Sequence, residues 1–177
     1  MATRIGMVLL ALSAAGCAVS RPVAVTTGAG VAAAAYADVH DAQGKLLGRL
    51  LLTPSAGGVR VQGTLQGLPP GTHALHLHAV GQCVPPFTSA GPHFNPENVP
   101  HGLSSLQGGH AGDLPNVIVG QNGQAVVDVT GRARLEGSTG ILDADGAAVV
   151  LHAAADDNVT DPAGNAGARI ACGVITR

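Results

Sequence analysis

The feature that most constrains the fold is a series of short apolar runs, each ended by residues that favour turns. The chain has 26 Gly and 11 Pro, and no stretch keeps a helical period for three turns. Short strands at this spacing are typical of antiparallel sandwiches and barrels. We expect eight strands, over residues 32–40, 46–53, 59–66, 72–80, 117–120, 125–130, 147–153 and 169–176.

Two segments interrupt this pattern, residues 81–114 and 154–168. Loops of this length in a compact domain are usually functional, so we expect the chemistry to lie there. A shorter connection, Gln121-Asn122-Gly123, predicts a β-hairpin between the runs 117–120 and 125–130, because Asn-Gly tolerates the positive φ angles of a tight turn.

The composition limits which residue types can form the core and which partners the protein can bind. Aromatic residues make up only 2% of the chain, so the core must be built from Val, Leu, Ile and Ala. Nine Lys and Arg stand against 11 Asp and Glu, and Lys45 is the one lysine. Nucleic-acid binding needs a cluster of basic side chains, which this composition excludes. An acidic disordered chain is excluded too, because the chain is apolar and nearly neutral.

The N-terminus is expected to be removed or to serve as an anchor. Residues 1–16 carry one positive charge and then an 11-residue apolar stretch. That stretch is too short to span a bilayer, which takes about 20 residues, and it predicts a secretory signal peptide. Ala14-Ala15-Gly16-Cys17 resembles a bacterial lipobox, which predicts a lipid on Cys17; ordinary cleavage nearby is the alternative. Residues 17–31 are expected to form a flexible tether, and residues 32–177 the folded domain.

The expected export indicates where the protein is located and whether its other cysteines can form a disulfide. We expect a protein of the periplasm or cell envelope, anchored to a membrane through Cys17. An oxidising compartment permits a disulfide, and pairing Cys83 with Cys172 would close a loop of about 90 residues. Two buried free thiols are the alternative.

The histidines form a pattern rather than a scatter. His76 and His78 lie two residues apart in an expected strand, so they share one face, and Leu75 and Leu77 share the other. With the leucines in the core, the two imidazoles face outward, as two ligands of one metal would.

Further metal-ligand residues follow along the chain. His93, His101, His110 and Asp113 lie in the first interrupting segment and offer only nitrogen and oxygen donors, a set that suits zinc. His152 ends another expected strand, and neutral imidazoles suit copper as well as zinc.

These residues carry a family resemblance. His76-Leu-His78-Ala-Val-Gly-Gln-Cys83, Ala90-Gly-Pro-His93-Phe-Asn-Pro96, Gly109-His110-Ala-Gly-Asp113 and Gly164-Asn-Ala-Gly-Ala-Arg169 resemble copper/zinc superoxide dismutases over most of residues 32–177. The spacing H-x14-H-x7-H-x8-H-x2-D from His78 to Asp113 is highly specific. The resemblance implies an all-β fold, an eight-stranded antiparallel Greek-key sandwich or flattened barrel with two long functional loops.

The resemblance also implies roles for individual residues. Asp156 would link the rings of His76 and His101, and Arg169 would hold the superoxide anion beside the copper. Cys83 and Cys172 would form the disulfide between the first loop and the last strand. Copper would be bound by His76, His78, His93 and His152, and zinc by His93, His101, His110 and Asp113, so that His93 serves both metals and also carries a proton.

The expected function is the dismutation of superoxide to dioxygen and hydrogen peroxide. The alternative is a non-catalytic copper/zinc-binding module that buffers or delivers copper. Ala154 stands where animal members of the family carry a lysine that attracts the substrate, so we expect a shallow dependence of turnover on salt. His73 is expected to be a hydrogen-bonded strand residue and not a ligand. The sequence leaves monomer and homodimer open.

Overall fold

The computed structural model describes residues 34–177, together with Met1. The predicted signal peptide, Cys17 and the tether lie outside the described residues, apart from Met1. Among the described residues, no helix is long and apolar enough to cross a membrane.

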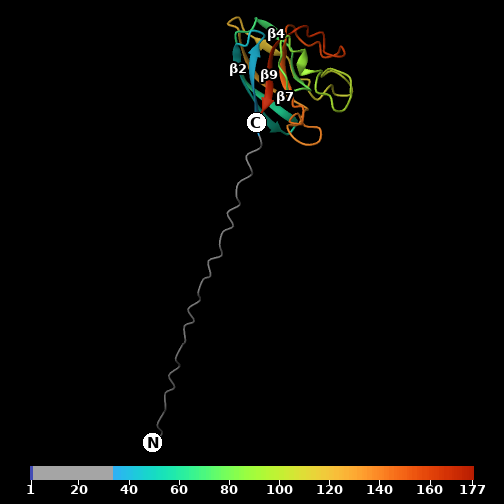
Figure 1. The fold of residues 1–177 in the computed structure, drawn as a ribbon. Coiled ribbons are helices and arrows are strands. Elements are labelled where there is room, and N and C mark those ends of the chain that lie inside the picture. The colour runs from blue at the N-terminus through green and yellow to red at the C-terminus, as the bar shows by residue number, and fades with distance from the viewer. Residues whose placement is uncertain (2–33) are drawn as a thin grey trace. The chain divides into compact units, whose positions relative to one another are not determined.

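The described residues form an all-β fold, as predicted. Seven strands make one curled antiparallel sheet in the order β5-β8-β9-β1-β2-β3-β7, and β4 and β6 form a second, two-stranded sheet (Figure 1). The strands are β1 (Ala35–Asp41), β2 (Leu46–Ser55), β3 (Gly58–Gln66), β4 (Gly71–His73), β5 (Leu75–His78), β6 (Val117–Val119), β7 (Gln124–Gly131), β8 (Ala148–His152) and β9 (Arg169–Thr176). One short 3₁₀ helix, η1 (Thr88–Ala90), lies in the first long loop.

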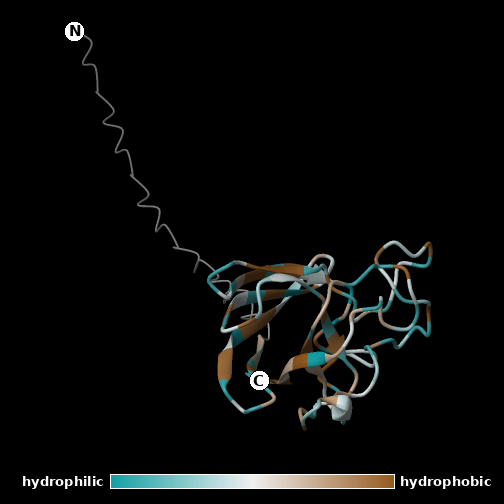
Figure 2. Cartoon of the chain, turned by 90° about the horizontal axis from the view of Figure 1, so that it is seen from above, coloured by the Kyte–Doolittle hydropathy of each residue, from teal (hydrophilic) through white to brown (hydrophobic). Residues whose placement is uncertain are grey.

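Alternating side chains build the core. In β1, Ala35, Ala37 and Val39 are buried, while the residues between them are partly exposed. The same alternation in β2 and β3 places small and branched apolar side chains inside the curled sheet, as the shortage of aromatic residues predicts. The apolar colour follows the strands, and much of the hydrophilic colour lies in the loops (Figure 2).

One local prediction is wrong and a second holds only in part. The run 72–80 is not one strand: it breaks at Ala74, so that β4 pairs with β6 while β5 pairs with β8. The runs 117–120 and 125–130 are joined by a tight turn, as predicted, in which the Gly120 N–H donates to Gln124 O at 2.9 Å. They do not pair along their length, because β6 pairs with β4 and β7 pairs with β3. Their connection is closed by the Gly123 N–H on Gly120 O, and the positive φ of 73° falls on Gly123 and not on Asn122.

The structure also has a long connection that the sequence pattern did not reveal. Residues 132–147 run from β7 to β8 without a strand of their own. Leu135 and Ile141 are buried in the core, so this segment contains apolar residues like those of a strand. Packing of these buried side chains against the core, and not a local strand pattern, therefore determines the path of residues 132–147.

The two expected functional loops are present and lie on the same side of the sheet. The first loop (residues 79–116) joins β5 to β6, and the second loop (residues 153–168) joins β8 to β9 (Figure 1). A disulfide between Cys83 and Cys172, with Cα atoms 5.6 Å apart, ties the first loop to β9. The predicted pairing is confirmed.

Candidate metal centre

Two neighbouring strands present three histidines to the loops. Leu75 and Leu77 of β5 point into the core, so His76 and His78 point to the opposite face. His152 ends β8, the strand paired with β5, at an irregularity after Leu151. The expectation that His76 and His78 face outward is only half right. They leave the core face, but neither is exposed at all, because the two long loops cover them.

The strand cluster consists of His76, His78, His152 and His93 of the first loop. One ring nitrogen from each residue lies within 4.8 Å of those of the others. His78 Nε2 and His152 Nε2 are 3.4 Å apart. His76 Nδ1 and His93 Nε2 are buried without a hydrogen-bond partner. Burying an unpaired polar atom is costly, so four converging nitrogens of this kind fit a metal ion.

The other ring nitrogen of each strand histidine is held by the protein. His78 Nδ1 donates to Gly91 O at 2.9 Å, and His152 Nδ1 lies 3.3 Å from Gly167 O. His76 Nε2 lies 2.7 Å from Asp156 Oδ2. Such contacts fix the ring orientation and decide which nitrogen remains free for a metal.

The loop cluster consists of His93, His101, His110 and Asp113, all from the first loop. Asp113 Oδ1 lies 2.9 Å from His93 Nδ1 and 3.1 Å from His101 Nδ1. His110 Nδ1 lies 3.3 Å from His93 Nδ1. Three imidazoles and one carboxylate fit a closed tetrahedral zinc site. His93 offers Nε2 to the strand cluster and Nδ1 to the loop cluster, so its ring joins the two.

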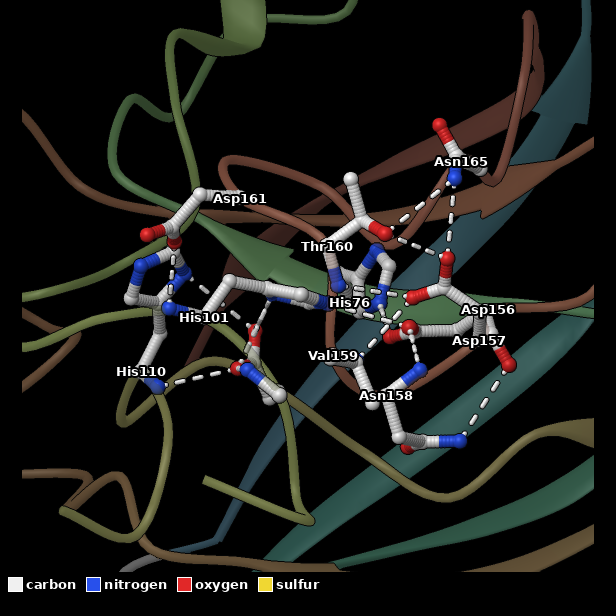
Figure 3. A network of polar contacts seen from close by, with 12 residues as sticks. His76, His101, His110, Asp156, Asp157, Asn158, Val159, Thr160, Asp161 and Asn165 are labelled. Carbon is white, nitrogen blue, oxygen red and sulfur yellow. Dashed lines mark hydrogen bonds and ion pairs between the residues drawn. The ribbon is translucent and has the colours of Figure 1, made fainter. Parts of the chain in front are cut away.

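Asp156 of the second loop connects the two clusters a second time. Its Oδ2 contacts His76 Nε2, and its Oδ1 lies 3.0 Å from His101 Nε2 (Figure 3). Gly164 passes so close that a Cβ there would lie 1.8 Å from Asp156 Oδ1, so this position requires glycine. Asp161, also in the second loop, accepts a hydrogen bond at its Oδ1 from the backbone N–H of His101 at 2.6 Å. This bond holds the second loop against the first.

The electrostatics of the two clusters differ. Burial lowers the pKa of His78 to about 2 and that of His152 to about 3, so both rings are neutral at pH 7. Burial also disfavours charge on His101, but hydrogen bonds with Asp113 and Asp156 prevail and raise its pKa to about 9. Burial works against the charge of both acids as well, yet their histidine contacts hold the pKa of each below its usual range.

Arg169 lies where the sequence predicted, beside the strand cluster. A cavity of about 450 Å³ is lined by Arg169, His93 and His152, among other residues of the two loops. Arg169 Nη1 donates to Phe87 O at 2.6 Å and Nη2 to Gly91 O at 2.7 Å. The sequence did not reveal these two carbonyls. A positive φ of 71° at the buried Phe87 is unusual for a bulky residue, and only the fold discloses it.

His73 is not a ligand. Its Nδ1 lies 2.8 Å from His152 O and its Nε2 lies 3.0 Å from Pro69 O, so both nitrogens are satisfied by backbone carbonyls. The prediction of a hydrogen-bonded strand residue is confirmed.

A curled antiparallel sheet with two adjoining donor clusters that share one imidazole defines a metalloprotein with a two-metal centre. Comparisons with known proteins agree. The sequence model for copper/zinc superoxide dismutase matches residues 47–175. A Cu-Zn superoxide dismutase of Caulobacter vibrioides is 42% identical over 147 residues, which cover 80% of this chain and 84% of that protein. Superoxide dismutase 2 of the Cu-Zn type from Aquifex aeolicus is 40% identical over 146 residues, covering 80% and 85%.

Solved structures show the same fold. The crystal structure of a superoxide dismutase-like protein from Bacillus subtilis matches with a TM-score of 0.73 and 38% identity, covering 78% of this chain and 96% of that chain. The chain belongs to the copper/zinc superoxide dismutase family, and its cofactors are copper and zinc.

Proposed function

We propose that the protein dismutates superoxide to dioxygen and hydrogen peroxide at the strand cluster. The observation that carries this proposal is the position of His93, whose ring joins the two clusters and lines the same cavity as Arg169. Copper would be held by His76 Nδ1 and by Nε2 of His78, His93 and His152. Zinc would be held by Nδ1 of His93, His101 and His110 and by Asp113.

When bound, copper supplies one-electron redox chemistry, taking an electron from one superoxide and giving one to the next. Arg169 binds and orients the anion. Its guanidinium has five N–H donors, and the two carbonyl contacts fix its plane while leaving other donors free for charge-assisted bonds. Because Phe87 and Gly91 belong to the first loop, that loop determines where the anion is held.

In this proposal, His93 also carries a proton. Its Nε2 is buried and has no protein partner, while Nδ1 is committed to the loop cluster. We infer that Nε2 alternates between two states: it would hold copper in one half of the cycle and a proton in the other, and it would pass that proton to the reduced oxygen species. Zinc, when bound at Nδ1, would keep the His93 ring oriented and would take no part in the electron transfer. Two superoxide anions and two protons thus give one dioxygen and one hydrogen peroxide.

The alternative is a copper/zinc-binding module without turnover, which buffers or delivers copper. The similarity to a protein described as superoxide dismutase-like is the observation that keeps it in view. This chain contains all four histidines of the strand cluster and Arg169, which favours the enzyme.

The test is superoxide consumption by the metal-reconstituted full chain and by a His152→Ala variant. The wild type should be active, and removal of this ligand should lower activity by more than ~100-fold, since loss of a mere ligand-supporting contact already costs about 10- to 100-fold. A His40→Ala variant is the matched control, because His40 lies outside both clusters. Equal activity in wild type and His152→Ala, or none in either, contradicts the proposal.

We further propose that the protein is exported to the periplasm or cell envelope, that its signal peptide is removed, and that Cys17 carries a membrane-anchoring lipid. The lipobox-like sequence before Cys17 supports this. Intact-mass measurement of the protein from its native membrane tests it. A mass without lipid, or a protein that still contains residues 1–16, contradicts it.

A further inference from the structure

Arg132 follows the last residue of β7 and reaches across to the first loop. We propose that Arg132 is a positioning residue for the loop cluster, which fixes the turn before His110 and thereby sets the affinity of that cluster for zinc. The inference rests on the zinc assignment made above, and it does not depend on whether the protein turns over superoxide.

The guanidinium of Arg132 contacts the first loop at two separate places. Nη1 donates to Gly108 O at 2.7 Å and to Gly109 O at 2.8 Å, immediately before His110. Nη2 donates to Glu97 Oε2 at 2.6 Å, in the part of the loop that precedes His101. One planar side chain therefore joins the stretches that lead into two ligands. A planar fork of fixed donors suits such a task better than a flexible ammonium group.

The turn that Arg132 holds has little stiffness of its own. Gly108 and Gly109 have φ angles of 87° and 72°, a region that favours glycine. The backbone also passes close to other groups, because a Cβ on Gly109 would lie 2.6 Å from Gly102 O. Two consecutive glycines have many conformations open to them. One hydrogen bond within the loop, from the Gly108 N–H to Ser105 O at 2.9 Å, and the contacts of Arg132 together select the observed turn.

His110 depends on this turn more than the other ligands do. The rings of His76, His78, His101 and His152 each have a second nitrogen within 3.3 Å of a protein oxygen. Within residues 34–177, His110 Nε2 has no such contact. What holds His110 is its backbone, whose N–H donates to Asp113 Oδ2 at 2.9 Å. Fixing Gly108 and Gly109 therefore fixes the ring of His110.

The ion pair of Arg132 with Glu97 is not the main part of the contact. The two side chains are 39% and 56% exposed, and exposed pairs contribute little stability. The hydrogen bonds of Arg132 to Gly108 O and Gly109 O directly hold the turn before His110. Removing Glu97 should therefore matter less than removing Arg132.

The experiment is a competition titration of the metal-free full chain with zinc and a chromogenic zinc chelator. Arg132→Gln should raise the zinc dissociation constant about 10-fold, the lower end of what loss of a contact supporting a ligand usually costs. Arg132→Lys should lie between it and the wild type, and Glu97→Gln should change the constant less than about 3-fold. Arg60→Gln is the matched control, because it removes an exposed ion pair with Asp128 on the same sheet, away from both clusters.

The visible absorption spectrum of bound copper provides a second readout. It should be unchanged in Arg132→Gln, since the variant alters only the loop cluster. Unchanged zinc affinity in Arg132→Gln, or equal loss in Arg60→Gln, overturns the inference. A wild type that does not bind zinc, or a His110→Ala variant that binds it normally, overturns the zinc assignment instead. If Arg132→Gln does not fold, Arg132→Lys decides: wild-type zinc affinity in that variant overturns the inference.

Discussion

The strand cluster and the loop cluster share His93 but are held in place by different means. His76, His78 and His152 are positioned by the register of β5 and β8, and burial keeps His78 and His152 neutral. The loop cluster lies on an irregular segment, and carboxylates position its rings. The comparison teaches that the cluster we assign to redox chemistry is built into the sheet, whereas the one we assign to zinc depends on contacts within and between loops.

Among the effects that compare the two clusters, the largest is expected for Asp156, which joins them. Asp156→Asn should weaken both copper and zinc binding, by about 10- to 100-fold, because an amide has one acceptor oxygen for two ring N–H groups. Competition titrations with a chelator for each metal measure this. Asp157→Asn is the control, since Asp157 contacts Thr160 and Asn165 but no ligand. A loss confined to one metal would show that the clusters are independent.

A second prediction separates the clusters by pH. His101 of the metal-free protein holds a proton below its pKa of about 9, and a ligand must lose its proton before it binds a metal. Zinc affinity should therefore rise up to ~tenfold per pH unit between pH 7 and 9 and then level off. The neutral rings of His78 and His152 should make copper affinity nearly constant over that range. Titrations from pH 6.5 to 10 check this, and parallel curves for the two metals would refute it.

A third prediction is that the substrate anion binds beside the strand cluster only, so that loss of Arg169 lowers activity without loss of either metal. Arg169→Gln should lower kcat/KM by about 10-fold, since it removes a charge-assisted contact to the anion. Metal content should stay at two ions per chain, because Arg169 binds carbonyls and no ligand side chain. Pulse radiolysis and elemental analysis provide the two readouts. Loss of zinc in this variant would mean that the guanidinium supports the loop cluster as well.

The smallest expected effect concerns salt. The second loop contains Asp156, Asp157 and Asp161 but no lysine, so Arg169 is the cation that faces the cavity. Long-range attraction should be weak, and kcat/KM should fall less than about 2-fold between 10 and 150 mM ionic strength. A steep decline would show that cations other than Arg169 attract the anion to the cavity.

The strands and the ligand set could be predicted because their signals are local or fixed in spacing. Seven of the eight expected runs contain one strand each, near the expected bounds, since apolar alternation and turn residues act over a few positions. The separations from His78 to Asp113 indicated the donors that the structure brings together.

The rest depends on contacts between distant segments. The break at Ala74 follows from competition between β6 and β8 for the same run, which no local pattern encodes. The complete burial of His76 and His78 is caused by loops far along the chain. No sequence pattern marks Arg132 as a loop contact, and only the fold brings it to Gly108 and Gly109.

The cavity beside Arg169 has a consequence for how long the protein keeps its copper. His76 and His78 are completely buried, whereas His93 and His152 line the cavity that Arg169 also lines. The positive charge of Arg169 is fixed at this cavity. If the strand cluster works as proposed, this charge would bind a small anion at short range and would repel a copper ion leaving the cluster. We therefore expect the same guanidinium to serve both substrate binding and copper retention.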